Sequence, residues 1–360
     1  MLKETTIPFG PQHPVLPEPI HVDLVVEDEK VVDATPAIGY IHRGLELLVE
    51  KKEYQEFVYV AERICGICSF IHGMGYCQGV EELMSLEVPE RALYLRTFWS
   101  ELSRIHSHLL WLGLAADAFG FENLFMQSWR VRELILDIVE ETTGGRVIFG
   151  SSKIGGVRRD VDADTLARIG GVLTGLRREI KKVTDVFLSD ATVNTRLRGV
   201  GVLSKEDAYL LGAVGPMLRA SGHEIDTRKI GYAAYKNVDF EVITAGEGDS
   251  YARCKVRIGE IAQSFDIIRQ VIDKIPGGPV EIKVTGSPPV GDALVRLEQP
   301  RGEVVYYVKS NGTKFLDRFR VRTPTFANVP SMVKIMKGAS VADIPTIILT
   351  IDPCISCNER

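Results

Sequence analysis

The chain has 360 residues, of which 45% are hydrophobic and 25% are charged, and its formal net charge is −5. The acidic balance argues against general nucleic-acid binding, which needs a basic surface. The longest uncharged apolar stretches, near residues 109–116 and 344–351, are far shorter than the roughly 20 residues of a membrane-spanning helix. The N-terminus contains no apolar signal region, so the sequence predicts a cytoplasmic protein.

The first forty residues favour β-structure. Residues 20–26 and 30–34 are rich in Val and Ile, and Glu27-Asp28-Glu29 between them is typical of a hairpin turn. This pattern predicts an N-terminal β-hairpin region over residues 1–40.

A helical pattern begins near His42 and runs to about Ala61, breaks at the segment around Cys65 and Cys68, and resumes over residues 69–86. Cys68 is therefore expected at the N-terminus of a helix. The helix dipole would favour a thiolate at this position.

The strongest predicted helix covers residues 90–116, where apolar side chains recur every three or four residues. Further helices are predicted over 122–142, 161–188, 205–219 and 249–275. These apolar stripes indicate core packing. They predict a helical core over residues 41–285.

After Gly286 the pattern changes to short strands, predicted over 293–298, 303–309 and 315–321, with a turn at Asn311-Gly312. A helix near 326–337 and the apolar run 344–351 follow, which completes a β/α region over residues 286–360. The fold class is therefore predicted to be mainly α with a small β portion (α+β), with one domain over residues 1–360. Its long-helix bundle is the core, the β portion comes from both ends of the chain, and both terminal segments converge on a buried metal site.

Four of the six cysteines form two Cys-x-x-Cys pairs, Cys65/Cys68 and Cys354/Cys357, at nearly opposite ends of the chain. Such pairs in a cytosolic protein indicate metal binding or redox chemistry. Sites with four thiolates hold zinc or iron–sulfur most often, and spacing alone favours structural zinc, with a cluster second. The remaining Cys77 and Cys254 lack partners at ligand spacing and are predicted to be ordinary buried thiols.

The residues around the two pairs are more specific than the spacing. Arg63-x-Cys65-Gly66-x-Cys68-x-x-x-His72 near the N-terminus, together with Asp352-Pro353-Cys354-x-x-Cys357, resembles the large subunit of nickel–iron hydrogenases. Further matches are Gly10-Pro11-Gln12-His13-Pro14, His42-Arg43-Gly44-Leu45-Glu46 and Glu298-Gln299-Pro300-Arg301-Gly302-Glu303. The first of these and the short length are similar to the membrane-bound, energy-converting branch, which shares ancestry with the quinone-site subunit of respiratory complex I.

This resemblance implies a binuclear centre in which nickel is held by all four thiolates. Cys68 and Cys357 would bridge to an iron that carries CO and cyanide ligands. Cys65 and Cys354 would bind nickel alone, and a thiolate of this kind can take a proton when H2 is split. The implied reaction is 2H⁺ + 2e⁻ ⇌ H2. The resemblance leaves room for a magnesium ion and implies no iron–sulfur cluster in this chain.

The same resemblance assigns roles to further residues. Arg301, preceded by Pro300 at the cofactor, would lie over the open metal position, since a guanidinium keeps its charge and its fork of donors. Glu18 would be the first proton acceptor. Without the resemblance, both residues would be interpreted as surface loop residues.

Three more residues complete the implied site. His72 would donate to a bridging sulfur, although a lone helical histidine is more often simply packed. Thr325 would donate a hydrogen bond to a cyanide, and Asp352 would orient the second cysteine pair. His42 and Arg43 match a family motif, and they either structure the site or carry protons.

The implied partners are an iron–sulfur small subunit, a ferredoxin-type electron carrier and ion-translocating membrane subunits, with no nucleic acid. The chain would dock peripherally on the cytoplasmic side of the membrane. Two other hypotheses remain, namely a non-hydrogenase coupling subunit like that of complex I and a zinc-stabilised helical binding protein. Metal analysis separates all three.

Overall fold

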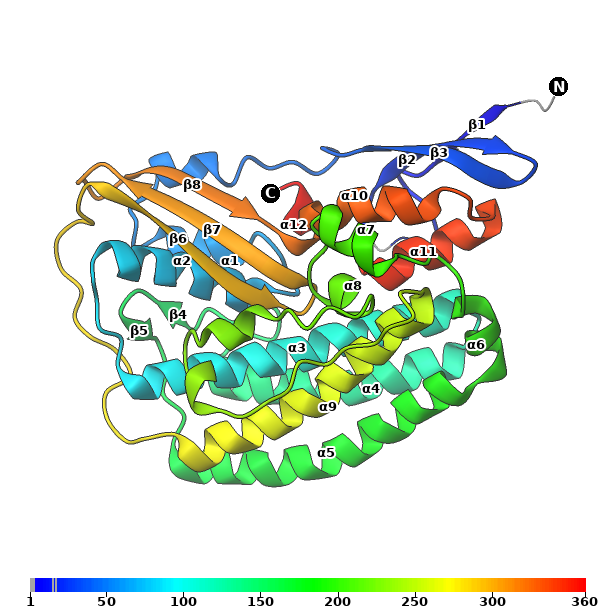
Figure 1. The fold of residues 1–360 in the computed structure, drawn as a ribbon. Helices are drawn as coiled ribbons and strands as arrows, with labels where there is room; N and C mark the ends of the chain where they lie inside the picture. The colour runs from blue at the N-terminus through cyan, green and yellow to red at the C-terminus, as the bar shows by residue number, and fades with distance from the viewer. Residues whose placement is uncertain (1–3, 15, 17) are drawn as a thin grey trace.

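The computed structural model describes residues 4–14, 16 and 18–360. Its lower layer consists of four long helices that run side by side (Figure 1): α3 (Glu90–Ala118), α4 (Glu122–Thr143), α5 (Ala163–Ser189) and α9 (Ser250–Lys274). Helix α3 packs against α4 and α9, and α5 packs against the same two helices. Side chains of the predicted stripe, such as Leu95, Leu102 and Leu109, are fully buried, so the periodic apolar face forms the main core.

An N-terminal sheet covers a second, smaller core. Strands β1 (Thr5–Phe9), β2 (His21–Glu27) and β3 (Lys30–Ala37) pair antiparallel in that order. Alternate residues of β2 are buried, and they pack with α10 (Pro324–Met336) and α11 (Ile344–Ile351). This core is thus built from both ends of the chain.

A C-terminal sheet lies over the other end of the long helices. Strands β6 (Gly291–Gln299), β7 (Gly302–Ser310) and β8 (Leu316–Arg322) pair antiparallel in that order. The sheet packs on α2 (Ser69–Leu83), which in turn packs on α1 (Phe57–Glu62). Helix α12 (Ile355–Asn358), near the C-terminus, lies between this sheet and the N-terminal one (Figure 1).

The remaining elements are short connectors: β4 (Ser152–Lys153), β5 (Gly156–Val157), α6 (Ala191–Leu197), α7 (Lys205–Leu210), α8 (Pro216–Arg219), and the 3-10 helices η1 (Leu47–Glu50), η2 (Thr227–Ile230), η3 (Tyr235–Asn237) and η4 (Val341–Asp343).

The predicted mixed fold, mainly helical with small sheets, is confirmed, but two local predictions were wrong. Most of residues 42–61 is not helical, because Gly44 has a φ of 63° and only η1 and α1 form there. The helix predicted over 205–219 is divided into α7 and α8, since Gly212 and Gly215 also have positive φ. Within the described residues the β portion forms two three-stranded sheets, one from each end of the chain as predicted, and the short two-stranded pair of β4 and β5.

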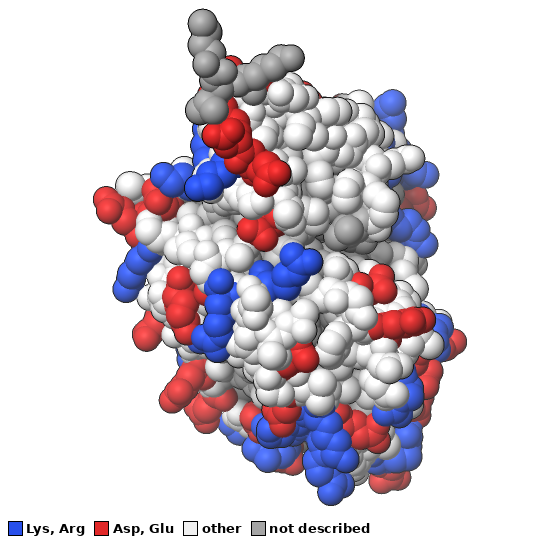
Figure 2. Space-filling model, turned by 90° about the vertical axis from the view of Figure 1, so that its right-hand side faces the viewer, with Lys and Arg blue, Asp and Glu red and all other residues white. Residues whose placement is uncertain are grey.

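Among the described residues, no helix combines the length and the apolar character that crossing a membrane requires. Figure 2 shows the face at the right-hand side of Figure 1. Charged side chains crowd its lower part and are sparse across its middle, so the charge on this face is distributed unevenly.

Candidate metal centre

The four paired cysteines meet in one buried group, separate from both hydrophobic cores. The Sγ atoms of Cys65 and Cys354 lie 3.4 Å apart. The sulfurs of Cys65, Cys354 and Cys357 all lie within 4.8 Å of one another, and Cys68 belongs to the same group. Each of the four side chains is at most 1% exposed. The fold therefore brings thiols from both ends of the chain to one place.

The first pair lies in the tight loop between α1 and α2. Cys68 is the N-cap of α2, as the sequence predicted. The amides of Ile67 and Cys68 donate to Cys65 Sγ at 3.2 and 3.3 Å, which favours the charged thiolate. From α3, the ring of His106 contacts the carbonyl of Ile67 at 3.0 Å. The loop is thus fixed from within and from the helix beside it.

The second pair follows α11, which ends at Asp352 with a left-handed φ of 61°. The amide of Cys354 donates to Thr325 Oγ1 at 3.0 Å. Thr323 Oγ1 donates to the carbonyl of Cys357 at 3.1 Å. The start of α10 therefore positions both cysteines of the second pair through its hydroxyl groups, and Thr325 contacts the backbone of Cys354.

Arg43 joins the two cysteine segments directly. Its guanidinium donates to the carbonyls of Arg63 at 3.0 Å and Ile64 at 2.9 Å, just before the first pair. It also donates to the carbonyl of Ser356, between the cysteines of the second pair, at 2.9 Å. His42 Nδ1 lies 2.8 Å from the carbonyl of Glu359. These contacts join the C-terminal segment to the loop that carries the first pair.

Arg301 extends from the tip of the β6–β7 hairpin to the cysteine group. Its Nε donates to the carbonyl of Asp352 and its Nη2 to Asp352 Oδ1, both at 2.8 Å. Nη1 lies 3.4 Å from Cys68 Sγ and 3.4 Å from Ser107 Oγ. Burial alone would lower the pKa of Arg301, but Asp352 and the neighbouring cysteines hold it well above its ordinary value. The side chain is therefore a fixed positive charge against the thiols.

The hairpin is held by a close backbone contact and by buried charges. Gly302 has a φ of 130°, and a Cβ there would lie 2.7 Å from the amide nitrogen of Gly215, so only glycine fits this approach. Arg104 on α3 donates to the carbonyls of Glu298 at 3.0 Å and Gln299 at 3.2 Å. Pro300, at the turn itself, is buried. These contacts fix the position of Arg301.

His72 lies one helical turn after Cys68, and its Nε2 is 3.3 Å from Cys357 Sγ. Its Nδ1 lies 2.9 Å from the hydroxyl of Tyr306, and the amide of Gln299 lies 3.1 Å from Nε2. Burial lowers the pKa of His72 to about 4, so the ring is neutral at ordinary pH. The tautomer decides the direction of these contacts: Nε2–H points at the sulfur when Nδ1 accepts from Tyr306, whereas the amide nitrogen of Gln299, a donor, favours an Nε2 without a proton.

Glu18 contacts the second cysteine pair at the start of α12. Its Oε2 accepts from the amide of Ile355, and from the amide of Ser356 at 3.1 Å; its Oε1 accepts from Ser356 Oγ at 2.7 Å. A carboxylate oxygen has two acceptor positions, so Oε1 keeps one. Glu18 thus lies directly beside the residue that follows Cys354.

The residues present fit a thiolate-bound nickel–iron group. Hydrogen bonds from Cys354, Cys357 and Cys68 lower the pKa of the Cys65 thiol well below its ordinary value, and the neighbouring thiols and burial raise the pKa values of the other three cysteines. A metal ion bound among them would supply the positive charge that favours all four as soft thiolate ligands. Around the group, Gln299 Oε1 and Asp352 Oδ2 are buried polar atoms that have no partner within the described chain. The donor set and its polar surroundings are consistent with a bound metal group.

Sequence reasoning missed four residues that position the site: His106, Ser107, Gln299 and Tyr306. Gln299 lies within the motif from Glu298 to Glu303, so its position at the site could have been predicted from the sequence. The run from His106 to His108 interrupts the apolar stripe of α3 with polar side chains that are fully or almost fully buried, which was a usable signal. Tyr306 is one inward-facing strand residue among several, and nothing in the pattern distinguished it. Cys77 and Cys254 are buried but lie outside the cysteine group.

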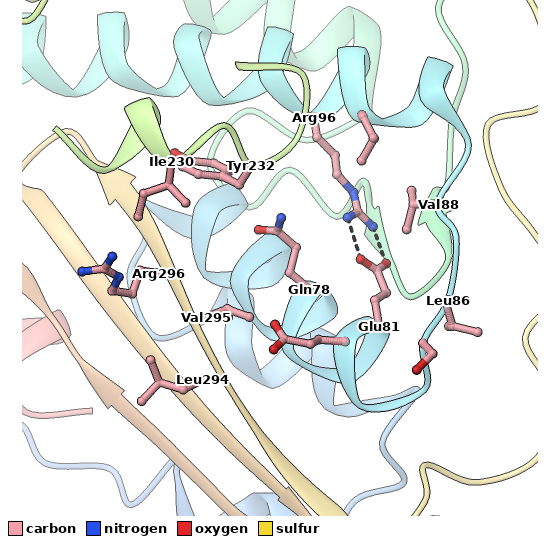
Figure 3. A pocket seen from close by; sticks show the side chains of 13 residues that line it. Gln78, Glu81, Leu86, Val88, Arg96, Ile230, Tyr232, Leu294, Val295 and Arg296 are labelled. Carbon is pink, nitrogen blue, oxygen red and sulfur yellow. Dashed lines mark hydrogen bonds and ion pairs between the residues drawn. The ribbon is translucent and has the colours of Figure 1, made fainter. Parts of the chain in front are cut away.

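A cavity of about 620 Å³ lies elsewhere, among α2, β6 and the turn that carries Ile230 and Tyr232 (Figure 3). Inside it, Glu81 and Arg96 form a two-point ion pair at 2.6 and 2.8 Å. The pair is also bonded to the backbone of Gly155 and Gly156. The pair occupies most of the polar atoms of both side chains, but Arg96 Nε is buried without a partner among the described residues.

Two family profiles match the chain. The one described as "Respiratory-chain NADH dehydrogenase, 49 Kd subunit" matches residues 119–287 and 282–360, and the one described as "Nickel-dependent hydrogenase" matches residues 43–115. The hydrogenase match includes the first cysteine pair, and the respiratory match includes the second.

Individual relatives cover almost the whole chain. The carbon monoxide-induced hydrogenase of Rhodospirillum rubrum is 38% identical over 99% of both chains. The alpha subunit of the membrane-bound hydrogenase of Pyrococcus furiosus is 38% identical over 98% of this chain and 87% of that protein. A subunit of the F(420)H(2) dehydrogenase of Methanosarcina mazei is 36% identical over 99% of this chain and 98% of that protein.

A solved structure shares the fold. It is a chain in the structure of the membrane-bound sulfane sulfur reductase, an archaeal respiratory membrane complex, and it superposes with a TM-score of 0.94 at 31% identity, over 99% of this chain and 98% of that one. The same fold therefore occurs in proteins named for different reactions.

Proposed function

Because the chain belongs to the family that unites the large subunits of nickel-dependent, membrane-bound hydrogenases with the 49 kDa subunit of respiratory NADH dehydrogenase, we propose that it is the catalytic subunit of an energy-converting nickel–iron hydrogenase. Its relatives show that it is an oxidoreductase-type module of a multi-subunit membrane complex. The reaction that we propose for it is 2H⁺ + 2e⁻ ⇌ H2.

The observation that carries this proposal is the single buried group formed by Cys65, Cys68, Cys354 and Cys357. A coupling subunit without metal has no need to bury four thiols in contact, since free thiols contribute only ordinary packing there. When bound, the nickel–iron group would supply the position at which H2 is formed or split heterolytically. All four cysteines would hold it.

The surrounding residues then have distinct tasks. Arg301 holds a permanent positive charge 3.4 Å from Cys68 Sγ and excludes water from that side of the group. With its proton on Nε2, His72 donates to Cys357 Sγ and stabilises its negative charge. Cys68 and Cys357, the two sulfurs that these donors contact, are the proposed bridging ligands.

The terminal thiolates would handle protons. The Cys354 sulfur is the proposed first acceptor, and Glu18, bonded to the two amides that follow Cys354, would take the proton from it and pass it outward. This proposed proton transfer requires the free acceptor position of Glu18 Oε1. Cys65 is the other candidate for this exchange, although its lowered pKa makes it a weaker proton acceptor than Cys354.

The proposed partners follow from the composition of the site. Cys77 and Cys254 are the only other cysteines of the chain and lie far apart in sequence, so electrons would be exchanged with an iron–sulfur small subunit. A ferredoxin-type carrier and ion-translocating membrane subunits would complete the complex, with this chain on its cytoplasmic side. Relatives in respiratory membrane complexes support such an assembly.

Metal analysis and infrared spectroscopy of the purified complex test the proposal. Nickel and iron close to one each per chain, with bands from CO and cyanide, are expected, and Cys357→Ser should remove them. Cys254→Ser is the matched control, since that buried thiol lies outside the group. One zinc per chain without such bands would instead favour a structural site, and no metal would favour the coupling subunit suggested by the long match to the 49 kDa profile.

A further inference from the structure

A second buried carboxyl lies near the cysteine group, and no step proposed above uses it. Glu62 is the last residue of α1, three positions before Cys65, and its side chain is 0% exposed. Neither carboxyl oxygen has a hydrogen-bond partner among the described residues. Buried polar groups are nearly always satisfied, so an unpartnered carboxyl inside the fold requires a chemical explanation.

The position of Glu62 is fixed by its contact with α2. A Cβ on Gly73 would lie 2.6 Å from Cγ of Glu62 and 2.8 Å from its Oε1, so glycine at this position makes room for the carboxyl. Gly73 directly follows His72, on the helix that Cys68 begins. Glu62 therefore lies against the first turns of the metal-site helix, outside the group of thiols itself.

On its other side, Glu62 faces the segment that leads into β4. The amides of Gly150 and Ser152 approach the carboxyl, and the hydroxyls of Ser151 and Ser152 are buried without partners, as Glu62 is. The carboxyl of Glu62 is thus buried beside a segment whose amides approach it and whose own hydroxyls have no partner among the described residues. Such surroundings are suited to ordered water, which makes several hydrogen bonds to groups of this kind.

The charges that face Glu62 come from three elements. Arg63 follows it on the chain, Arg158 approaches from the segment after β5, and Cys77 faces it from α2. Burial raises the pKa of Glu62 to about 7, and the two arginines oppose this rise. Both protonation states are therefore accessible near neutral pH.

Arg158 both faces Glu62 and lines a cavity open to the surface. Its guanidinium lies over the ring of Tyr59 at 4.5 Å and donates to the carbonyl of Ser152 at 3.1 Å. Arg158 and Tyr59, both exposed, line a cavity of about 520 Å³ together with Glu56. The layer between the buried carboxyl and this cavity thus includes an exposed, flexible side chain.

We propose that Glu62 is a buried proton-exchanging carboxyl that takes up and releases one proton through the cavity beside Tyr59 and Arg158. Uptake converts the carboxylate to the neutral acid, and cavity water supplies the proton and receives it back. The chain would then carry two acid–base positions near the cysteines, Glu62 beside the first pair and Glu18 beside the second. The use of this proton in hydrogen chemistry rests on the proposed function, but the exchange itself does not.

Infrared difference spectra between pH 5 and 9, recorded on the purified complex, test the exchange directly. A carboxylic acid C=O band should disappear with a midpoint near pH 7, shift in D2O, and be missing in Glu62→Gln. Glu56→Gln, an exposed change on the same cavity, should keep the band. A wild-type spectrum without such a band, or a band that persists in Glu62→Gln, would overturn the proposal.

A second variant keeps the test independent of Glu62 itself. Arg158→Gln removes an opposing positive charge, so the midpoint should move to higher pH by roughly one unit, whereas Arg159→Gln next to it should leave the midpoint unchanged. An unmoved midpoint in Arg158→Gln would contradict the assigned path. The carboxylic acid band of Glu62 can be measured whether the complex contains nickel or zinc. Failure of the proposed hydrogenase function would therefore leave this band in place, and failure of the present proposal would remove it.

Discussion

Asp352→Asn should remove one charge from the site and leave its shape intact. Asparagine tolerates the left-handed φ of 61° at this position, so we expect the backbone conformation to stay unchanged. The guanidinium of Arg301, bonded twice to Asp352 at 2.8 Å and 5% exposed, would lose its buried counter-charge. Breaking a buried pair from one side costs about 3–5 kcal/mol. We expect about 3 kcal/mol, because the amide oxygen still accepts a hydrogen bond and because burial raises the pKa of Asp352 despite Arg301, so that removing this charge also removes part of its own cost of burial.

Urea unfolding of the metal-free protein measures this cost. A loss of about 3 kcal/mol lowers the folding equilibrium constant roughly 100-fold and shifts the midpoint without changing the slope. In a double-mutant cycle, Arg301→Met combined with Asp352→Asn should cost about 3 kcal/mol less than the sum of the single changes. Asp185→Asn, in an exposed pair with Lys181, should cost less than about 0.5 kcal/mol. An additive cycle would refute the assigned pairing.

Three further outcomes are expected. Arg43→Gln should lower the free energy of unfolding by about 1–3 kcal/mol, because hydrogen bonds to three carbonyls are weakened. Limited proteolysis should then cut the C-terminal segment faster, and an unchanged rate would contradict the contact of Arg43 with that segment. Gly302→Ala should lower the thermal midpoint through its contact with Gly215, whereas Gly171→Ala, a helical position with open space, should raise stability by up to about 1 kcal/mol. The raised pKa of Glu62 means that the folded state binds the extra proton, so the contribution of Glu62 to stability should fall by about 3 kcal/mol as pH rises from about 4.5 to about 7. Buried histidines such as His72, with lowered pKa values, contribute in the opposite direction, so the difference in free energy of unfolding between wild type and Glu62→Gln is the quantity to measure. This difference should change by about 3 kcal/mol across the range, and a constant difference would exclude Glu62 as the cause.

The long helices were predictable because their signal is local. A stripe of apolar residues at helical spacing needs one large partner surface, and α3, α4, α5 and α9 supply it to one another. The segment from His42 to Glu46 has a helical composition as well, but its polar side chains bind carbonyls and a guanidinium more than 300 residues away, such as Glu359 and Arg360. Contacts of that separation override local propensity, and no pattern within the segment indicates them.

The residues of the candidate site also fall into two groups, those that a local sequence motif indicates and those that depend on distant contacts. The family resemblance allowed Arg301, His72 and Glu18 to be placed near the cysteines. In the structure Arg301 and His72 contact sulfur atoms, whereas Glu18 contacts the backbone between the cysteines of the second pair. Tyr306 and Ser107 act through single atoms that contact His72 and Arg301. Their positions depend on the register of β7 and the rotation of α3, which are fixed only once the sheet and the helices have packed.

The sequence separation between the two cysteine pairs also determines how long the first pair exists during translation before the second pair is synthesised. Cys65 and Cys354, whose sulfurs lie 3.4 Å apart, are 289 residues apart in the chain. At translation rates of about 5–20 residues per second, the first thiols emerge roughly 15–60 s before the second pair is made. During that interval Cys65 and Cys68 are without their partners and are open to oxidation and to stray metal ions. The nascent chain would therefore benefit from a reducing compartment or a protecting factor that acts before translation ends.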